Sequence, residues 1–232
     1  MVRPAPLDVD SMRWERPDMT ETVTARFATP RLWRSAGAAV AATMLLGGVA
    51  CSAGGGLDEV EHYLDLSDEP MAASSAELVD VDGEAWRFTD VDPDRLTLLF
   101  FGYTSCPDVC PMTMAEIDLA LEEAGAVADD VDVVMVTSDP ARDTDEQLRS
   151  WLDRFDPGFQ GVRGEIEDIV AAAGDYGIPI EAPQETDGDY LVSHGGRIIV
   201  LTEGGEAAGM FDEGVEADQV AELLPVLVEE LL

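Results

Sequence analysis

The sequence predicts an α/β protein in which helices flank a central mixed sheet. Two nearly continuous apolar segments of strand length, 96–102 and 131–137, have the composition of strands buried on both faces. The apolar residues between them are spaced for one face of a helix: Met114, Ile117 and Leu121. A buried strand, a helix and a second buried strand favour a right-handed βαβ unit.

A β-hairpin is expected before this unit. Residues 77–81 and 86–88 alternate in polarity on either side of Asp82 and Gly83, a dipeptide typical of a tight turn. The hairpin would add two antiparallel strands to the predicted sheet.

Two helices, a second hairpin and a final helix are expected after the βαβ unit. Thr144 and Gln147 have the spacing of a capping box that opens a helix through Phe155, and a second helix is expected over 165–176. Three short strands are predicted over 190–193, 197–201 and 207–211, followed by an amphipathic helix over 217–232. These elements predict one globular domain over 74–232.

The first fifty residues read as an export segment. Residues 35–50 carry no charge, Arg31 and Arg34 precede them, and small residues lead up to Cys51, which is the order of a secretory signal. The proline-containing stretch before Arg31 has no apolar period, and internal methionines offer alternative starts. We therefore exclude residues 1–50 from the fold prediction.

Cys51 follows this segment in a way that resembles a prokaryotic lipoprotein signal. The resemblance implies a lipid on Cys51, a flexible tether over 51–73, and anchoring to the outer face of the cytoplasmic membrane. The alternative is an uncleaved membrane anchor in which Cys51 plays no part. Both readings place the domain outside the cytoplasm.

Charge excludes several classes of function. The 232 residues include 13 basic and 49 acidic side chains, which gives a formal net charge of -36. Such a chain repels the phosphates of nucleic acids, so nucleic-acid binding is excluded. The sequence contains no lysine, so Schiff-base chemistry is excluded as well.

Cys106 and Cys110 are the candidate reactive residues of the domain. They lie between the first buried strand and the helix that follows, where loops of α/β sheets bind ligands. A disulfide would close too small a loop to stabilise the fold much, and the helix N-terminus is expected to favour thiolates. Two such thiols can bind Cu(I) or Zn²⁺, or can exchange with a disulfide.

A third metal ligand has to come from one of two histidines. His62 lies in the predicted tether and is expected to be solvated. His194 ends a predicted strand and precedes Gly195 and Gly196, whose backbone freedom suits a loop that approaches a ligand. We expect His194 to be the candidate ligand.

The segment Gly102-Tyr-Thr-Ser-Cys-Pro-Asp-Val-Cys-Pro111 resembles the signature of the SCO/SenC family. Three further segments resemble parts of that family: Val136–Thr144, Gln147–Gly161 and Tyr190–His194. The resemblance implies a thioredoxin-like fold, copper as the bound metal, as Cu(I) and in many members Cu(II), and ligation by Cys106, Cys110 and His194. It also implies delivery of copper to the copper-bearing subunit of cytochrome c oxidase.

Some positions depart from the family pattern or have an open role. Ser193 and Gly195 stand where the family commonly has Asp and Ser, and loss of that Asp could weaken the site. Asp108 could tune the thiols, or could simply be a solvated acid at a helix start. Arg142 is expected to pair with Asp139 or Asp143, and no catalytic role is assigned to it.

Three functions compete on these residues. A metallochaperone would bind Cu(I) through both thiols and His194 and pass it on by ligand exchange. A thiol–disulfide oxidoreductase would use Cys106 and Cys110 as its redox pair and would not need His194. A peroxidase would need a Thr-x-x-Cys loop, whereas Thr104 is only two positions before Cys106.

Overall fold

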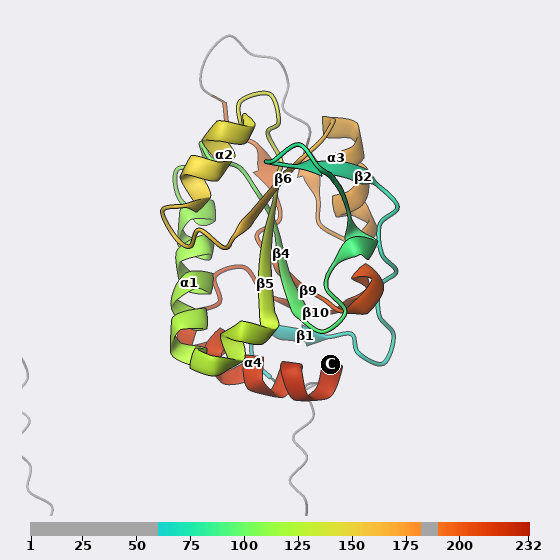
Figure 1. Cartoon of the computed structure of the whole chain (residues 1–232), viewed down its shortest axis with the longest axis vertical. Coiled ribbons are helices and arrows are strands. Elements are labelled where there is room, and N and C mark those ends of the chain that lie inside the picture. The colour runs from blue at the N-terminus through green and yellow to red at the C-terminus, as the bar shows by residue number, and fades with distance from the viewer. Residues whose placement is uncertain (1–59, 182–189) are drawn as a thin grey trace, which may run out of the picture. The chain divides into compact units, whose positions relative to one another are not determined.

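The computed structural model describes residues 60–181 and 190–232 (Figure 1). An eight-stranded mixed sheet has the order β1-β10-β9-β4-β5-β6-β2-β3, and β7 pairs with β8 in a separate two-stranded sheet. The strands are β1 (Tyr63–Asp65), β2 (Glu77–Asp80), β3 (Ala85–Arg87), β4 (Leu96–Gly102), β5 (Val131–Thr137), β6 (Gln160–Arg163), β7 (Ile180–Glu181), β8 (Ser193–His194), β9 (Ile198–Leu201) and β10 (Ala207–Phe211). The helices are α1 (Val109–Ala124), α2 (Asp145–Leu152), α3 (Ile166–Asp175) and α4 (Ala217–Leu231).

The predicted βαβ unit forms the centre of the sheet. β4 and β5 pair in parallel from Leu96 opposite Val131 to Gly102 opposite Thr137, and α1 connects them. Every residue of β4 is buried, which explains the unbroken apolar run in the sequence. The predicted α/β class with a mixed sheet flanked by helices is confirmed.

Helices cover both faces of this sheet. In Figure 1, α1 and α2 lie on one side of the central strands and α3 on the other, while α4 packs against α1. The capping box of Thr144 and Gln147 is present at the start of α2, as predicted. α2 ends at Leu152 rather than at Phe155. Among the described residues, none of the helices is both long and apolar enough to cross a membrane.

β6 was not predicted from the sequence. In the chain it lies between the two predicted helices, and in the sheet it pairs in parallel with β5. Its four residues contain Gly161, where an added Cβ would lie 2.8 Å from Leu148 of α2. The close approach of α2 requires a glycine here, and this removes the apolar alternation by which a strand is recognised.

The prediction of a flexible tether over 51–73 is wrong for its described C-terminal part. β1 pairs antiparallel with β10, and Met71 forms a bridge with Ala207. The ring of Tyr63 packs 5.0 Å from that of Phe211, over Gly209, where a Cβ would overlap the tyrosine hydroxyl. This pairing depends on distant residues, so the local sequence does not reveal it. Residues 51–59, with Cys51, and the export segment 1–50 lie outside the described residues.

Candidate metal centre

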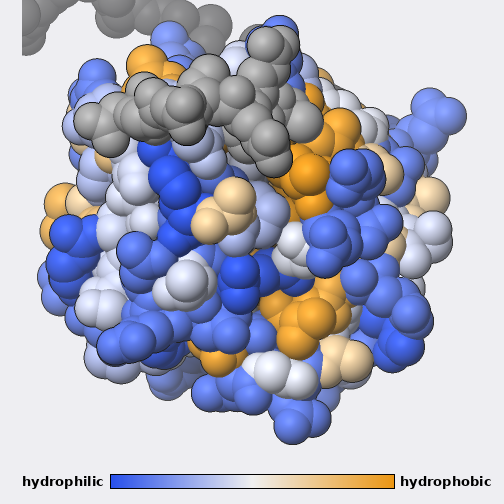
Figure 2. Space-filling model, turned by 90° about the horizontal axis from the view of Figure 1, so that it is seen from above, coloured by the Kyte–Doolittle hydropathy of each residue, from blue (hydrophilic) through white to orange (hydrophobic). Residues whose placement is uncertain are grey.

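β4 and β5 finish at the same end of the sheet (Figure 1), and the predicted ligands converge next to it. After β4 the chain turns through residues 103–108 into α1, which places Cys106 half-buried in the turn and Cys110 fully buried in the first turn of the helix. Figure 2 looks down on the molecule from the top of Figure 1 and shows a mainly hydrophilic surface with separate hydrophobic patches.

Three potential metal-binding atoms converge at this point. The sulfurs of Cys106 and Cys110 and a ring nitrogen of His194 lie within 4.8 Å of one another. The Cys110 Sγ atom is 3.3 Å from His194 Nε2, and both cysteines are free thiols. His62 lies elsewhere, in the turn before β1 and 3.7 Å from Glu61. The structure thus brings together the three residues selected from the sequence.

His194 has the orientation and charge of a metal ligand. Its Nδ1 atom lies 3.1 Å from the carbonyl oxygen of Gly195, so a proton on Nδ1 leaves the Nε2 lone pair facing Cys110. Burial lowers the pKa of His194 and outweighs the opposing influence of the Gly195 carbonyl and of Glu213. The imidazole is therefore neutral near pH 7, the form that binds metals.

The two thiols differ in acidity. Burial raises the pKa of Cys106, but hydrogen bonds from the backbone N–H groups of Cys110 and Asp108, together with those from the side chains of Cys110 and Tyr103, outweigh it, so the net pKa is lowered. Burial raises the pKa of Cys110. The prediction that both thiols are acidic holds for Cys106 and is wrong for Cys110. Metal binding therefore has to release the proton of Cys110.

A buried carboxylate supports the cysteine-bearing turn. Asp143 accepts hydrogen bonds from the backbone N–H of Thr104 at 2.9 Å, from its hydroxyl at 2.5 Å, and from the hydroxyl of Thr137 at 2.6 Å. Asp143 is completely buried. From the sequence, Asp143 was expected only as an alternative partner of Arg142 within Val136–Thr144, and no local pattern assigns it to the site.

A second buried carboxylate, Asp139, lies two residues beyond the end of β5. It pairs with Arg142, which was expected from the sequence to pair with either Asp139 or Asp143. It also accepts a hydrogen bond from the Tyr190 hydroxyl at 2.7 Å. The guanidinium carbon of Arg142 lies 3.7 Å from the centre of the Tyr190 ring. Sequence reasoning missed Tyr190, because only tertiary structure places it beside Arg142.

The residues that depart from the family pattern surround His194. Ser193 is exposed and pairs with Glu181, and the imidazole Nδ1 atom of His194 faces the Gly195 carbonyl. Gly195 donates its N–H to Pro179, and an added Cβ would lie 3.2 Å from that proline. Glu213 accepts a hydrogen bond from the Gly196 N–H at 3.1 Å and fixes the loop after His194.

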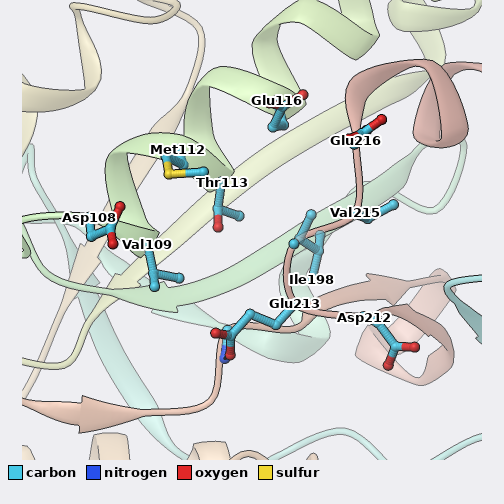
Figure 3. Close-up of a pocket in the computed structure, with 12 residues that line it drawn as sticks. Asp108, Val109, Met112, Thr113, Glu116, Ile198, Asp212, Glu213, Val215 and Glu216 are labelled. Carbon is cyan, nitrogen blue, oxygen red and sulfur yellow. The ribbon is translucent and has the colours of Figure 1, made fainter. Parts of the chain in front are cut away.

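A groove of about 290 Å³ adjoins the candidate metal centre (Figure 3). The first two turns of α1 form one wall and residues 212–216 the other, and Asp108 and Glu213 line both this groove and the hollow above Cys106. Asp108 is exposed at the N-cap of α1 and makes no side-chain capping bond. This agrees with the interpretation of Asp108 as a solvated acid.

Comparisons with known proteins agree with this site. The sequence profile of the SCO1/SenC family matches residues 66–229. A Stutzerimonas stutzeri protein named for copper binding is 33% identical over 68% of this chain and 78% of its own. Protein sco1 of Schizosaccharomyces pombe is 28% identical over 66% of this chain, which spans 59% of that relative's length. The structure of Bradyrhizobium japonicum ScoI with copper bound is similar, with a TM-score of 0.59 and 30% identity over 67% of this chain and 98% of its own.

Proposed function

Because the chain belongs to the SCO1/SenC family, we propose that it is a copper chaperone that binds copper through Cys106, Cys110 and His194. The cargo would pass to the binuclear copper site in the copper-bearing subunit of cytochrome c oxidase. The observation that carries the proposal is the convergence of two sulfurs and one imidazole nitrogen within 4.8 Å, from segments that are far apart in the sequence.

The donor atoms suit Cu(I). Thiolate and imidazole are ligands that bind soft and borderline metals well, and three of them enclose Cu(I) without a fixed fourth ligand. Cys110 is fully buried, whereas Cys106 and His194 are both partly exposed and line the same hollow as Pro107 and Asp108. An incoming ligand from a partner can therefore reach the metal through this hollow, past Cys106 and His194.

The proposed location is the outer face of the cytoplasmic membrane. The uncharged segment 35–50, preceded by arginines and followed by Cys51, supports export and lipid attachment at that cysteine. Release of copper to an oxidase subunit requires the chaperone to be held on the same side of the membrane. The anchor and the partner both belong to the proposal.

Copper affinity of the reduced protein tests the three-ligand site. Wild type, His194→Ala and His62→Ala are compared in a competition with a chromophoric Cu(I) chelator. The expected result is one copper per chain in wild type, unchanged affinity in His62→Ala, and at least about tenfold weaker binding in His194→Ala, since losing one ligand exposes the metal to competing thiols. Equal affinity in all three proteins would contradict the proposal.

A second candidate function is thiol–disulfide exchange, favoured by the difference between the two thiols. The Cys106 thiolate would attack a substrate disulfide and form a mixed disulfide, which Cys110 would resolve to give reduced substrate and an intramolecular disulfide. His194 takes no part in this reaction. Formation and reduction of the Cys106–Cys110 disulfide in a glutathione redox buffer should therefore persist in His194→Ala.

A further inference from the structure

The segment that carries His194 has few regular contacts with the body of the domain. β8 contains two residues and pairs only with β7, which also contains two, and neither strand belongs to the eight-stranded sheet. Two backbone-paired residues fix a segment poorly. The 3.3 Å approach of His194 to Cys110, 84 positions away, therefore requires other contacts.

Tyr190 supplies such a contact four residues before His194. Its hydroxyl donates a hydrogen bond to the Asp139 carboxylate at 2.7 Å, and its ring covers the Arg142 guanidinium at 3.7 Å. Asp139 is completely buried and is paired with Arg142. A buried carboxylate that lost its partners would carry a large desolvation cost, so these three groups hold one another firmly.

The same arginine contacts the ring that packs on His194. Arg142 lies 5.8 Å from the centre of the Tyr103 ring, on the turn that leads to Cys106. The Tyr103 ring meets the imidazole edge-on, with the centroids 5.6 Å apart and the planes at 90°. Arg142 therefore contacts both the segment that carries the thiols and the segment that carries the imidazole.

We propose that Asp139, Arg142 and Tyr190 form a clasp that positions His194 toward the two thiols. The three residues are positioning residues and do not touch the metal. The clasp anchors the start of the histidine segment to the loop after β5, which the sheet itself holds in place. Without it, His194 would sample positions away from Cys110, and the site would lose its third ligand for part of the time.

Two readouts test the inference, and only the second depends on the proposed copper function. The first readout uses the full-length protein without metal: modification of His194 by diethyl pyrocarbonate, measured by mass spectrometry, with His62 as the internal reference in the same chain. The second is Cu(I) affinity by chelator competition. If the wild-type protein does not bind copper, the proposed function is wrong. The first readout would still show whether Tyr190 helps to position His194.

Tyr190→Phe is the principal variant, because it removes the hydroxyl bond to Asp139 and keeps the ring over Arg142. Tyr176→Phe is the matched control: its buried hydroxyl donates to the Gly205 carbonyl at 2.8 Å and accepts from the Ser74 N–H at 3.2 Å, and neither partner belongs to the candidate metal centre. Tyr190→Leu removes the ring as well. Thermal unfolding of each variant separates a local effect from loss of the fold.

Tyr190→Phe should raise the modification rate of His194 relative to His62 severalfold and weaken Cu(I) binding by about tenfold, as for loss of one hydrogen bond to a carboxylate. Tyr190→Leu should have larger effects, and Tyr176→Phe none on either readout. In a His194→Ala background, Tyr190→Phe should weaken copper binding no further, because the clasp acts through His194.

Two results would overturn the inference. One is wild-type His194 reactivity and wild-type copper affinity in folded Tyr190→Phe and Tyr190→Leu. The other is an equal loss of copper affinity from Tyr190→Phe with and without His194, which would mean that Tyr190 acts on the thiols or on the whole fold.

Discussion

Replacement of Asp143 by alanine should destabilise the domain strongly. The carboxylate accepts three hydrogen bonds from Thr104 and Thr137, and alanine would leave the buried Thr137 hydroxyl and the two partly buried donors of Thr104 without an acceptor. Each buried donor left unpaired costs about 1–3 kcal/mol, so we expect a loss of about 3–5 kcal/mol after partial relaxation. That is a large share of a typical domain stability of about 5–15 kcal/mol.

Asp143→Asn separates hydrogen bonding from charge. An amide oxygen in place of Oδ2 still accepts from the Thr104 N–H and the Thr137 hydroxyl, and the amide nitrogen can donate to the Thr104 hydroxyl. We therefore expect this variant to lose less than about 1.5 kcal/mol. Burial is the main reason for the raised pKa of Cys110, and the Asp143 charge contributes to it, so alkylation of Cys110 should begin at lower pH in Asp143→Asn.

Urea unfolding followed by far-ultraviolet circular dichroism measures both changes. Asp145→Ala is the matched control, because this aspartate is two residues away but exposed, and its pair with Arg163 should contribute less than about 1 kcal/mol. Two results would contradict these expectations: an equal unfolding midpoint for Asp143→Ala and Asp145→Ala, or an Asp143→Asn variant as unstable as Asp143→Ala.

Three further predictions concern the thiols, a turn and the anchor. Since the pKa of Cys106 is lowered and that of Cys110 raised, limiting iodoacetamide at neutral pH should label Cys106 first, and peptide mapping that found Cys110 labelled first would contradict this order. Gly205→Ala should lower thermal stability far more than Gly204→Ala. Both glycines have positive φ, but only at Gly205 would a Cβ lie 2.1 Å from the Phe88 carbonyl oxygen. A Cβ at Gly204 would meet open space, so Gly204→Ala should cost only about 1 kcal/mol. Mass spectrometry of the native protein should find a lipid-modified Cys51 at the N-terminus, and recovery of residues 35–50 in the mature chain would indicate an uncleaved anchor instead.

Much of the fold could be predicted from the sequence, because many of its elements are specified by residues close together in the chain. β4 and β5 appear as apolar runs since both faces of each strand are covered, and the capping box of Thr144 and Gln147 lies within four residues. The close spacing of Cys106 and Cys110 after a buried strand likewise marks a strand-to-helix turn with two thiols. Such patterns are set by neighbours in the chain, so a single sequence contains them.

Other features depend on residues far apart in the chain and were decided only by tertiary structure. β1 pairs with β10, with Tyr63 packed over Gly209. β6 has no apolar alternation in the sequence, because Gly161 is needed for the close approach of α2. At the site, the sequence supplied the identities of the two cysteines and the histidine. Which thiol is acidic was decided by the balance of burial and hydrogen bonding, and the place of His194 by contacts across the fold, because desolvation and long-range packing have no local signature in the sequence.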